Sequence, residues 1–256
     1  MDVEVIGLDG DDTLWHNERM FTLTQERFRQ LLAPYVSADR LDAHLFETQT
    51  ANLELFGYGV KAFTLSMIET AVELTGGAVS ANDIQRIIDA GKEMAIHPVV
   101  LLDGVAETIA ALADRYRLML VTKGDLFDQE SKLARSGLAD RFWRVAIVAR
   151  KDPAAYRRVL GDAGVEPGRF LMVGNSVPSD VAPVVAIGGR AAHVPYDLTW
   201  AHETAEPIAD HERVWNLTSI IELPARLSGH PGPGGPGPGG PGPGDGHPGS
   251  GGPGRP

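Results

Sequence analysis

The sequence predicts an α/β protein with a doubly wound parallel sheet and an inserted all-helical domain. From residue 101 onward, short apolar segments alternate with segments of helical periodicity, which is typical of a parallel sheet covered by helices. Before this alternation, residues 19–97 show helical periodicity and no convincing strand. A chain of 256 residues, 43% of them hydrophobic, is long enough for an α/β core and a smaller second domain.

The first strand is expected at residues 3–8, a mostly apolar segment that ends at Asp9. Residues 19–97 then divide into helices at Gly57 and at Gly76-Gly77, and Ser37 and Ser80 are suitable helix N-caps. We interpret this segment as a small helical bundle inserted after the first strand.

The remaining elements alternate along the chain. Strands are expected at residues 118–121, 145–148, 170–173, 191–194 and 214–215. Helices are expected at 105–116, 128–136, 153–160, 180–187 and 219–227. We therefore assign residues 1–18 and 98–227 to the α/β core and residues 19–97 to a helical cap.

The C-terminal segment, residues 228–256, has a different composition from the rest. Its last 28 residues contain 14 Gly and 9 Pro and no aliphatic side chain. Such a segment buries too little apolar surface to offset the entropy of ordering, so we expect a disordered tail. A role as a linker or partner tether, with the globular part as a scaffold, is an alternative interpretation of the protein.

Charge and composition exclude several classes of function. The formal net charge of −11 argues against binding to a nucleic acid backbone, which needs clustered Lys and Arg. The chain has no Cys, which excludes disulfides, thiolate metal sites and Cys nucleophiles. No apolar stretch approaches the roughly 20 residues that span a bilayer, so we expect a soluble cytoplasmic protein without membrane contact.

Polar clusters follow four of the predicted strands. The first contains Asp9 and Asp11, followed by Thr13. Carboxylates two residues apart in a turn after a strand can reach one point in space, where one acts as nucleophile and the other as acid and base. This pair needs a cation to offset its mutual repulsion. Surplus acidic residues in a capping loop are the alternative.

The second and third clusters suit a phosphate. Thr122 stands at a strand end beside Lys123 and Gly124, where a hydroxyl and backbone amides can bind an anion. Lys151 follows the next strand and can neutralise a phosphoryl group. Taken singly, each is also explained by a capping threonine or a solvated surface lysine.

The fourth cluster contains Asn175 and Asp180 after the strand at 170–173. A carboxamide oxygen and a carboxylate are suitable ligands for a hard cation such as Mg²⁺. A tight turn before a capped helix is the alternative interpretation of this segment.

With these four clusters in this order, the sequence resembles the haloacid dehalogenase superfamily, in its phosphatase branch. The resemblance covers residues 3–227, and the DxDxT pattern at Asp9, Asp11 and Thr13 is its most specific part. It implies Mg²⁺-dependent hydrolysis of a small phosphorylated metabolite. In such an enzyme Asp9 is the nucleophile that becomes an aspartyl-phosphate, and Asp11 protonates the leaving group and then activates water.

The resemblance also implies roles for the other clusters. Thr122 and Lys151 would orient the phosphate, with Thr13, Lys123 and Gly124 nearby in the substrate site. The metal would be held by Asp9, the backbone carbonyl of Asp11 and the Asn175/Asp180 cluster. The cap would close over the site and select small substrates.

One residue departs from the phosphatase pattern. These phosphatases usually carry Asp where this chain has Asn175, and the metal-free dehalogenase branch also has Asn in this region. A 2-haloacid dehalogenase is therefore the main enzymatic alternative, although metal-free dehalogenases lack the second Asp that this chain retains as Asp11. A non-catalytic binding protein on the same scaffold is a third hypothesis.

Residues outside the four clusters are further candidates. An aromatic, glycine-punctuated loop in the cap contains Tyr58 and Lys61, which we expect over the leaving group. The alternative is an ordinary interhelical turn with Lys61 in solvent. Trp15 and His16 follow the first cluster and are expected at the entrance of the site. Neither the identity of the metabolite nor the oligomeric state follows from the sequence.

Overall fold

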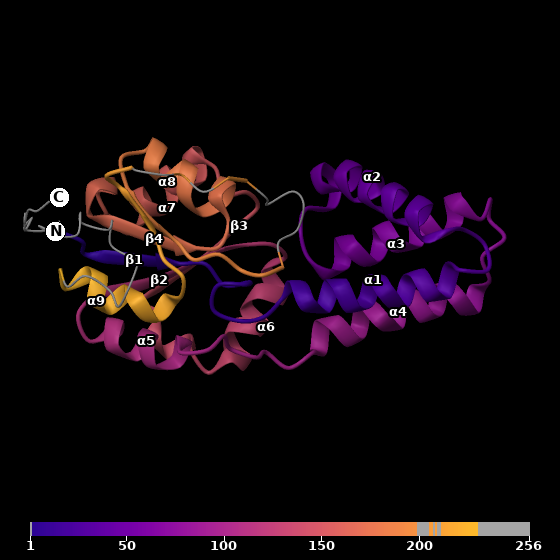
Figure 1. The fold of residues 1–256 in the computed structure, drawn as a ribbon, viewed down its shortest axis with the longest axis horizontal. Coiled ribbons are helices and arrows are strands. Elements are labelled where there is room, and N and C mark those ends of the chain that lie inside the picture. Colours follow the sequence, from indigo (N-terminus) through magenta and orange to yellow (C-terminus); the bar gives the residue numbers. More distant parts are fainter. Residues whose placement is uncertain (1, 199–204, 207, 209–210, 230–256) are drawn as a thin grey trace, which may run out of the picture.

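The computed structural model describes residues 2–198, 205, 206, 208 and 211–229. A sheet covered by helices lies beside a bundle of four helices (Figure 1). The chain enters the bundle after the first strand and returns to the sheet through α5 (Val105–Ala113). The predicted tail begins at residue 228, and residues 230–256 of it lie outside the described residues.

The sheet has the predicted α/β, doubly wound parallel form. Six strands of the described chain pair in the order β3-β2-β1-β4-β5-β6, and every neighbouring pair is parallel. The strands are β1 (Val5–Leu8), β2 (Arg117–Lys123), β3 (Arg144–Val148), β4 (Phe170–Gly174), β5 (Arg190–His193) and β6 (Val214–Asn216). From β1 the chain adds β2 and β3 on one side and then β4, β5 and β6 on the other, so the strand order reverses between β1 and β4. Doubly wound folds bind ligands at this point.

Strand β1 is central, and its side chains explain why. All four of its residues are buried, so the strand can only be stable between two neighbours with helices on both faces. Val5 pairs with Arg117 of β2 and with Phe170 of β4. Gly7 is required by close packing, because a Cβ there would lie 2.3 Å from the Phe170 ring.

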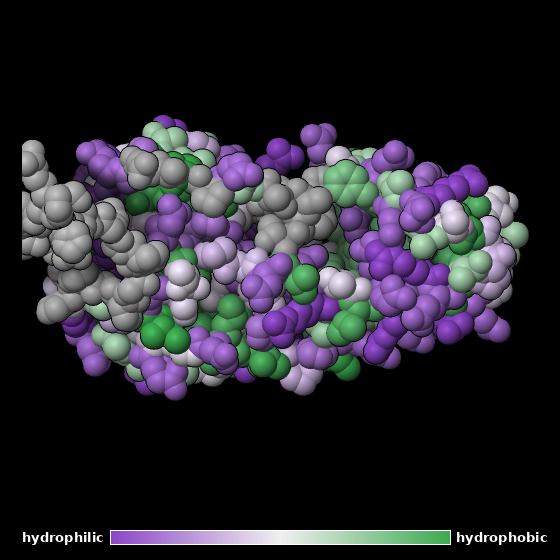
Figure 2. Space-filling view, in the orientation of Figure 1, coloured by the Kyte–Doolittle hydropathy of each residue, from purple (hydrophilic) through white to green (hydrophobic). Residues whose placement is uncertain are grey.

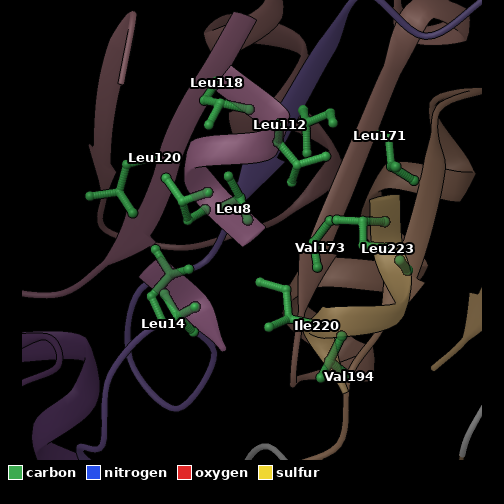
Figure 3. Packing of buried hydrophobic residues seen from close by; sticks show 14 of the residues in the cluster. Leu8, Leu14, Leu112, Leu118, Leu120, Leu171, Val173, Val194, Ile220 and Leu223 are labelled. Atoms are coloured by element: carbon green, nitrogen blue, oxygen red, sulfur yellow. The ribbon is translucent and has the colours of Figure 1, made fainter. Parts of the chain in front are cut away.

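Helices cover both faces of the sheet. One face packs against α7 (Pro153–Ala163) and α8 (Ala182–Ala186). The other packs against α5 (Val105–Ala113), α6 (Leu126–Ser136) and α9 (Leu223–Leu227), and Figure 3 shows strand and helix side chains of this face pointing toward one another. Short 3₁₀ turns occupy Ala139–Arg141, Pro167–Arg169 and Ile220–Glu222.

The inserted bundle has an apolar core of its own. It consists of α1 (Glu18–Leu32), α2 (Ala38–Phe56), α3 (Val60–Leu74) and α4 (Ala81–Ile96). Buried side chains from all four helices meet inside it, among them Phe28, Leu45, Met67 and Ile87. Ser80 caps α4 by accepting a hydrogen bond from the Asp83 N–H, and Gly57 ends α2 with a φ of 71°.

Two predicted helices are interrupted. The expected helix at 180–187 is a π-helical turn, Val177–Val181, followed by α8, and the expected helix at 219–227 is a 3₁₀ turn followed by α9. In both cases proline is the cause, because Pro183 and Pro224 lack the N–H that a continuous helix needs and so begin a new first turn.

Within the described part of the chain, no helix is both long enough and apolar enough to cross a bilayer. On the face drawn in Figure 2, hydrophilic side chains predominate over the outer end of the helical bundle. Together these observations agree with a bundle whose apolar side chains are directed inward.

Candidate active site

A cavity of about 160 Å³ lies between the carboxyl ends of the central strands and the helical bundle. Its sheet side is formed by residues that follow β1, β2, β3 and β4, and its opposite side by α1, α2 and α3. Eight residues singled out from the sequence line it: Asp9, Asp11, Tyr58, Thr122, Lys123, Lys151, Asn175 and Asp180.

Asp9 lies at the floor of this cavity. It extends the hydrogen-bond ladder of β1, because its N–H donates to the Val173 carbonyl at 2.9 Å, and only 7% of its surface is exposed. Lys151 Nζ donates to Asp9 Oδ1 at 2.5 Å and to Asp180 Oδ1 at 2.6 Å. One buried ammonium group therefore joins two buried carboxylates.

The electrostatics of this group are unbalanced toward negative charge. Burial raises the pKa of Asp9 to about 7, with help from the nearby charge of Asp180, although Lys151 acts in the opposite direction. For Lys151, burial favours the neutral amine, but the two carboxylates outweigh it and raise its pKa. The lysine stays charged, and one of its two carboxylates lacks a full counter-charge.

Local structure holds each partner in place. Asp152 caps α7, because its Oδ1 accepts the Ala155 N–H at 2.7 Å. This contact fixes the preceding residue, Lys151, at the N-terminus of the helix. Asp180 Oδ2 accepts the Ser176 N–H at 3.1 Å. Gly174 is needed beside it, because a Cβ there would lie 2.2 Å from the Asp180 carboxylate.

The carboxylate of Asp11 accepts hydrogen bonds from three side chains. Trp15 Nε1 lies 2.7 Å from Oδ1, Gln129 Nε2 lies 2.9 Å from Oδ2, and Lys132 Nζ lies within 3.1 Å of both oxygens. Burial opposes ionisation of Asp11, but the charge of Lys132 and these hydrogen bonds prevail and lower its pKa. In this arrangement Asp11 is a carboxylate that can accept a proton.

Trp15 does not line the entrance, and that prediction is wrong. Its side chain is 1% exposed and belongs to the core of the sheet domain, where it packs over Gly10. An indole is mostly apolar and finds more contact there, while its N–H reaches Asp11. His16 instead pairs its Nδ1 with the Tyr196 hydroxyl at 2.7 Å.

The second cluster meets the cap at the cavity wall. Thr122 is buried, and its hydroxyl donates to Gln129 Oε1 at 3.1 Å. Lys123 Nζ donates to Ser179 Oγ at 3.1 Å and lies 4.4 Å from the centre of the Tyr58 ring. Burial, together with the charge of Lys151, lowers the pKa of Lys123 to about 8.

Three residues predicted for the substrate site lie outside the cavity lining. The Thr13 hydroxyl lies 3.2 Å from Asn175 Oδ1 and 3.5 Å from Asp9 Oδ2, so it links the first and fourth clusters. Gly124 forms a turn with a φ of 135°. Lys61 is two-thirds exposed and pairs with Asp125 at 2.9 Å, across the boundary between bundle and sheet domain.

Other residues of the site did not emerge from the sequence patterns. Gln129 and Lys132 reach Asp11 from α6, and Glu18 lines the cavity at the start of α1. The first two stand three residues apart in a helix that follows a polar cluster, a spacing that puts both on one face and could have drawn attention to them. Glu18 carries no such signal.

The oxygen atoms at the cavity floor fit a hard divalent cation. No three Asp, Glu or His side chains of the described chain form a ready-made metal site. However, Asp9 and Asp180 both contact Lys151, and Asp9 and Asn175 Oδ1 both lie near the Thr13 hydroxyl. Negative charge is in excess among these groups. These are the donors that Mg²⁺ binds.

The buried aspartate after β1, the lysine joining it to a second aspartate after β4, and the inserted helical bundle agree with the resemblance seen in the sequence. A model of the haloacid dehalogenase-like hydrolase family matches residues 3–188. The chain belongs to this family. Among solved structures, a haloacid dehalogenase-like family hydrolase from Xanthomonas campestris is 42% identical with a TM-score of 0.81, covering 89% of this chain and 91% of that one.

Two further relatives of this haloacid dehalogenase-like hydrolase differ in reaction. The N-acylneuraminate-9-phosphatase of Mus musculus is 24% identical over 166 residues, which are 62% of this chain and 64% of that protein, so the match spans less than two thirds of that phosphatase. The structure of a 2-haloacid dehalogenase from Pseudomonas syringae pv. Tomato is 22% identical with a TM-score of 0.60, covering 88% and 98% of the two chains, and shows the shared fold alone.

Proposed function

We propose that this hydrolase is a Mg²⁺-dependent phosphomonoesterase that acts on a small phosphorylated metabolite through an aspartyl-phosphate on Asp9. The observation that carries the proposal is the buried Asp9–Lys151–Asp180 group at the floor of the cavity, with Asp11 beside it. A carboxylate nucleophile beside a fixed ammonium group is suited to an electrophile that is itself an anion.

In the first step an Asp9 oxygen forms a bond to phosphorus, and the bond from phosphorus to the leaving oxygen breaks. Negative charge on the equatorial oxygens is met by Lys151, Lys123 and the Thr122 hydroxyl. The leaving oxygen takes a proton from Asp11. Because Lys132 favours the ionised form of Asp11, this carboxylate has to take up a proton before the step begins.

In the second step Asp11, now ionised, accepts a proton from water while the water oxygen bonds to phosphorus. The bond between Asp9 and phosphorus breaks, which releases inorganic phosphate and restores the Asp9 carboxylate. The contacts of Asp11 with Lys132 and Gln129 favour the proton-accepting form that this step begins with.

Asp9, Asp180, Asn175 and the backbone carbonyl of Asp11 would hold the magnesium ion. When bound, it would supply positive charge to the phosphoryl oxygens and offset the carboxylate repulsion. The bundle residues over the cavity keep water from the site and limit substrate size, in agreement with a metabolite rather than a phosphoprotein.

The proposal is tested by hydrolysis of p-nitrophenyl phosphate with Mg²⁺ or with EDTA, in the wild type and in Asp9→Asn. We expect turnover that needs Mg²⁺ and disappears in the variant, which keeps the shape of the side chain but weakens its nucleophilicity. Circular dichroism controls for folding. No turnover by folded, Mg²⁺-supplied protein on this ester and on a broad panel of phosphorylated metabolites would refute the proposal.

Asn175→Asp tests the metal ligands separately. An added carboxylate within reach of the cation should lower the Mg²⁺ concentration for half-maximal activity, because carboxylates bind Mg²⁺ more strongly than carboxamides do. Thr13→Val is the matched control for a change in this neighbourhood that adds no charge. An unchanged Mg²⁺ requirement in Asn175→Asp would remove Asn175 from the metal site.

One observation favours a second candidate function, metal-free hydrolysis of a 2-haloacid. The residue at 175 is a carboxamide, and Lys151 already contacts both Asp9 and Asp180. Asp9 would then displace halide from carbon instead of attacking phosphorus. Release of chloride from 2-chloropropionate in the presence of EDTA would support this candidate over the phosphatase.

A further inference from the structure

The cavity has two halves of opposite chemistry. In the described chain, every lysine that lines it belongs to the sheet domain, and each is already bound by oxygen. Lys151 contacts Asp9 and Asp180, and Lys132 contacts Asp11 and Asp128. Lys123 donates to Ser179. The cationic groups are therefore concentrated around Asp9, where the phosphate would bind.

The half formed by the helical bundle has no cation among its described lining residues. Three aromatic side chains line it: Phe21 and Phe63 lie with ring centroids 5.0 Å apart, and Tyr58 lies beside Lys123. Its neutral polar side chains include the amides of Gln49 and of Gln25, whose Nε2 donates to Asp42 Oδ1 at 3.0 Å. Such a surface suits an uncharged group with an apolar face and hydroxyls at its edge.

The charged side chain at the boundary of this half is acidic. Glu18 is the first residue of α1 and lines the cavity near Asp11 and Asp12. Burial and the charges of those two aspartates raise the pKa of Glu18 to about 8, so the surroundings already disfavour one negative charge. A carboxylate or second phosphate on the substrate would lose its hydration here without gaining a counter-ion.

We propose, on the basis of the phosphatase function above, that the preferred substrates are phosphomonoesters of uncharged, hydroxylated alcohols of about the size of a sugar. The aromatic side chains would pack against the carbon face of the alcohol, and Gln25 and Gln49 would bind its hydroxyls. The volume of about 160 Å³ is well below the roughly 300–1,000 Å³ that drug-sized ligands occupy, in agreement with a small leaving group. Phosphates that carry a carboxylate, such as phosphoglycolate and N-acylneuraminate 9-phosphate, are disfavoured.

Matched substrates test this preference. The pairs are 2-hydroxyethyl phosphate with 2-phosphoglycolate, glycerol 3-phosphate with 3-phosphoglycerate, and glucose 6-phosphate with 6-phosphogluconate. In each pair the second member bears a carboxylate that the first lacks. We expect kcat/KM to be at least tenfold higher for the member without a carboxylate in at least one pair. In no pair do we expect the member with a carboxylate to have the higher kcat/KM.

A variant then tests where the selection arises. Gln49→Lys adds a cation to the bundle half and should raise kcat/KM for the carboxylate member of a pair. The ratio of kcat/KM between the two members should therefore become smaller. Gln49→Met has a similar length without charge and should leave kcat/KM low for that member. Circular dichroism shows whether each variant is folded, and Gln25→Lys replaces Gln49→Lys if that variant is not.

The possible results separate this inference from the proposed function. If the folded, Mg²⁺-supplied wild type hydrolyses neither p-nitrophenyl phosphate nor any phosphorylated metabolite of the broad panel, the phosphatase function fails and the substrate class fails with it. If that ester is hydrolysed but the carboxylate members are equal or better substrates, or neither member of any pair is a substrate, only the substrate class is overturned. A lysine variant that leaves the ratio unchanged overturns the assignment of selection to the bundle half.

Discussion

Glu18 is a single carboxyl group whose surroundings make folding stability depend on pH. Its pKa rises from 4.5 to about 8 on folding because burial and the charges of Asp12 and Asp11 penalise ionisation. Between these values the folded state binds more protons than the unfolded state, so stability falls as pH rises. We expect Glu18→Gln to escape this loss, so that its Tm increases relative to wild type from pH 5 to pH 8 and the difference then levels off.

Glu222 provides a control of opposite sign. Hydrogen bonding to Thr218 lowers its pKa, which stabilises the folded state above pH 4.5 and is lost in acid. Glu222→Gln should therefore be less stable than wild type near pH 7 and approach it at low pH. A Tm difference for Glu18→Gln that is constant from pH 5 to pH 9 would contradict the role given to Glu18.

Lys132 is a buried cation between two acidic groups, Asp11 and Asp128, with 12% of its side chain exposed. Removing one member of a buried ion pair leaves an uncompensated charge, at a typical cost of about 3–5 kcal/mol. We expect Lys132→Met to lower the free energy of unfolding by an amount in this range, measured by urea denaturation.

The matched control is Lys92→Met, because Lys92 also pairs with an aspartate, Asp89, but in solvent. That variant should unfold at the same urea concentration as wild type. Equal effects of the two substitutions would mean that burial does not decide the strength of the Lys132 contacts.

For individual residues, the sequence indicated those at strand ends and missed those on helix faces. Asp9 and Lys151 follow strands, and parallel strands bring their carboxyl ends to one edge, so their proximity followed from the pattern. Lys132 reaches Asp11 only because α6 packs with one particular face toward β1. Helix rotation depends on packing that no local motif encodes, which is why Lys132 and Gln129 were not predicted.

Among the helices, α7 has an unusually complete N-terminus: Asp152 caps it and Pro153 occupies its first turn. Removal of the cap leaves the Ala155 N–H without its partner, at a cost of about 1 kcal/mol. We expect Asp152→Ala to reduce the free energy of unfolding by this amount. Arg157→Ala, an exposed change within the same helix, should have a smaller effect in the same denaturation assay.

Element boundaries were predictable where side-chain pattern alone decides them. The strands at β1 and β4 are buried on both faces and appear in the sequence as continuous apolar runs. The prolines at 183 and 224 were compatible with a helix that starts early or one that starts late. In the structure the residues before Pro183 form a separate π-helical turn, Val177–Val181, which Ser176 caps by accepting the Ser179 N–H, and α8 begins after that turn.

At the scale of the whole molecule, contacts between side chains that join the bundle to the sheet domain near the cavity include Lys61 with Asp125, Tyr58 with Lys123 and Glu54 with Arg150. The first is solvent-exposed on the lysine side, so its contribution to stability is about 0.5 kcal/mol or less. We expect Lys61→Met to leave the free energy of unfolding within this margin and the preference among phosphate esters unchanged. A loss of selectivity in Lys61→Met would return this residue to the substrate site.

The layered α/β fold was predictable because alternating strands and helices leave few arrangements open, and that prediction is confirmed. The shape of the cavity was not predictable. It depends on which faces of α1 and α3 are turned toward β1, and so on contacts such as Phe21 with Phe63 between helices distant in sequence.

The position of β1 in the sheet also determines the order in which the chain assembles during synthesis. This strand leaves the ribosome before both of its partner strands, because Val5 pairs with residues 117 and 170, so its edges stay unpaired while the intervening chain is made. The bundle has its own apolar core and can form meanwhile. Such delayed pairing of distant segments is slow. The growing chain therefore carries an exposed, aggregation-prone strand until β4 has emerged.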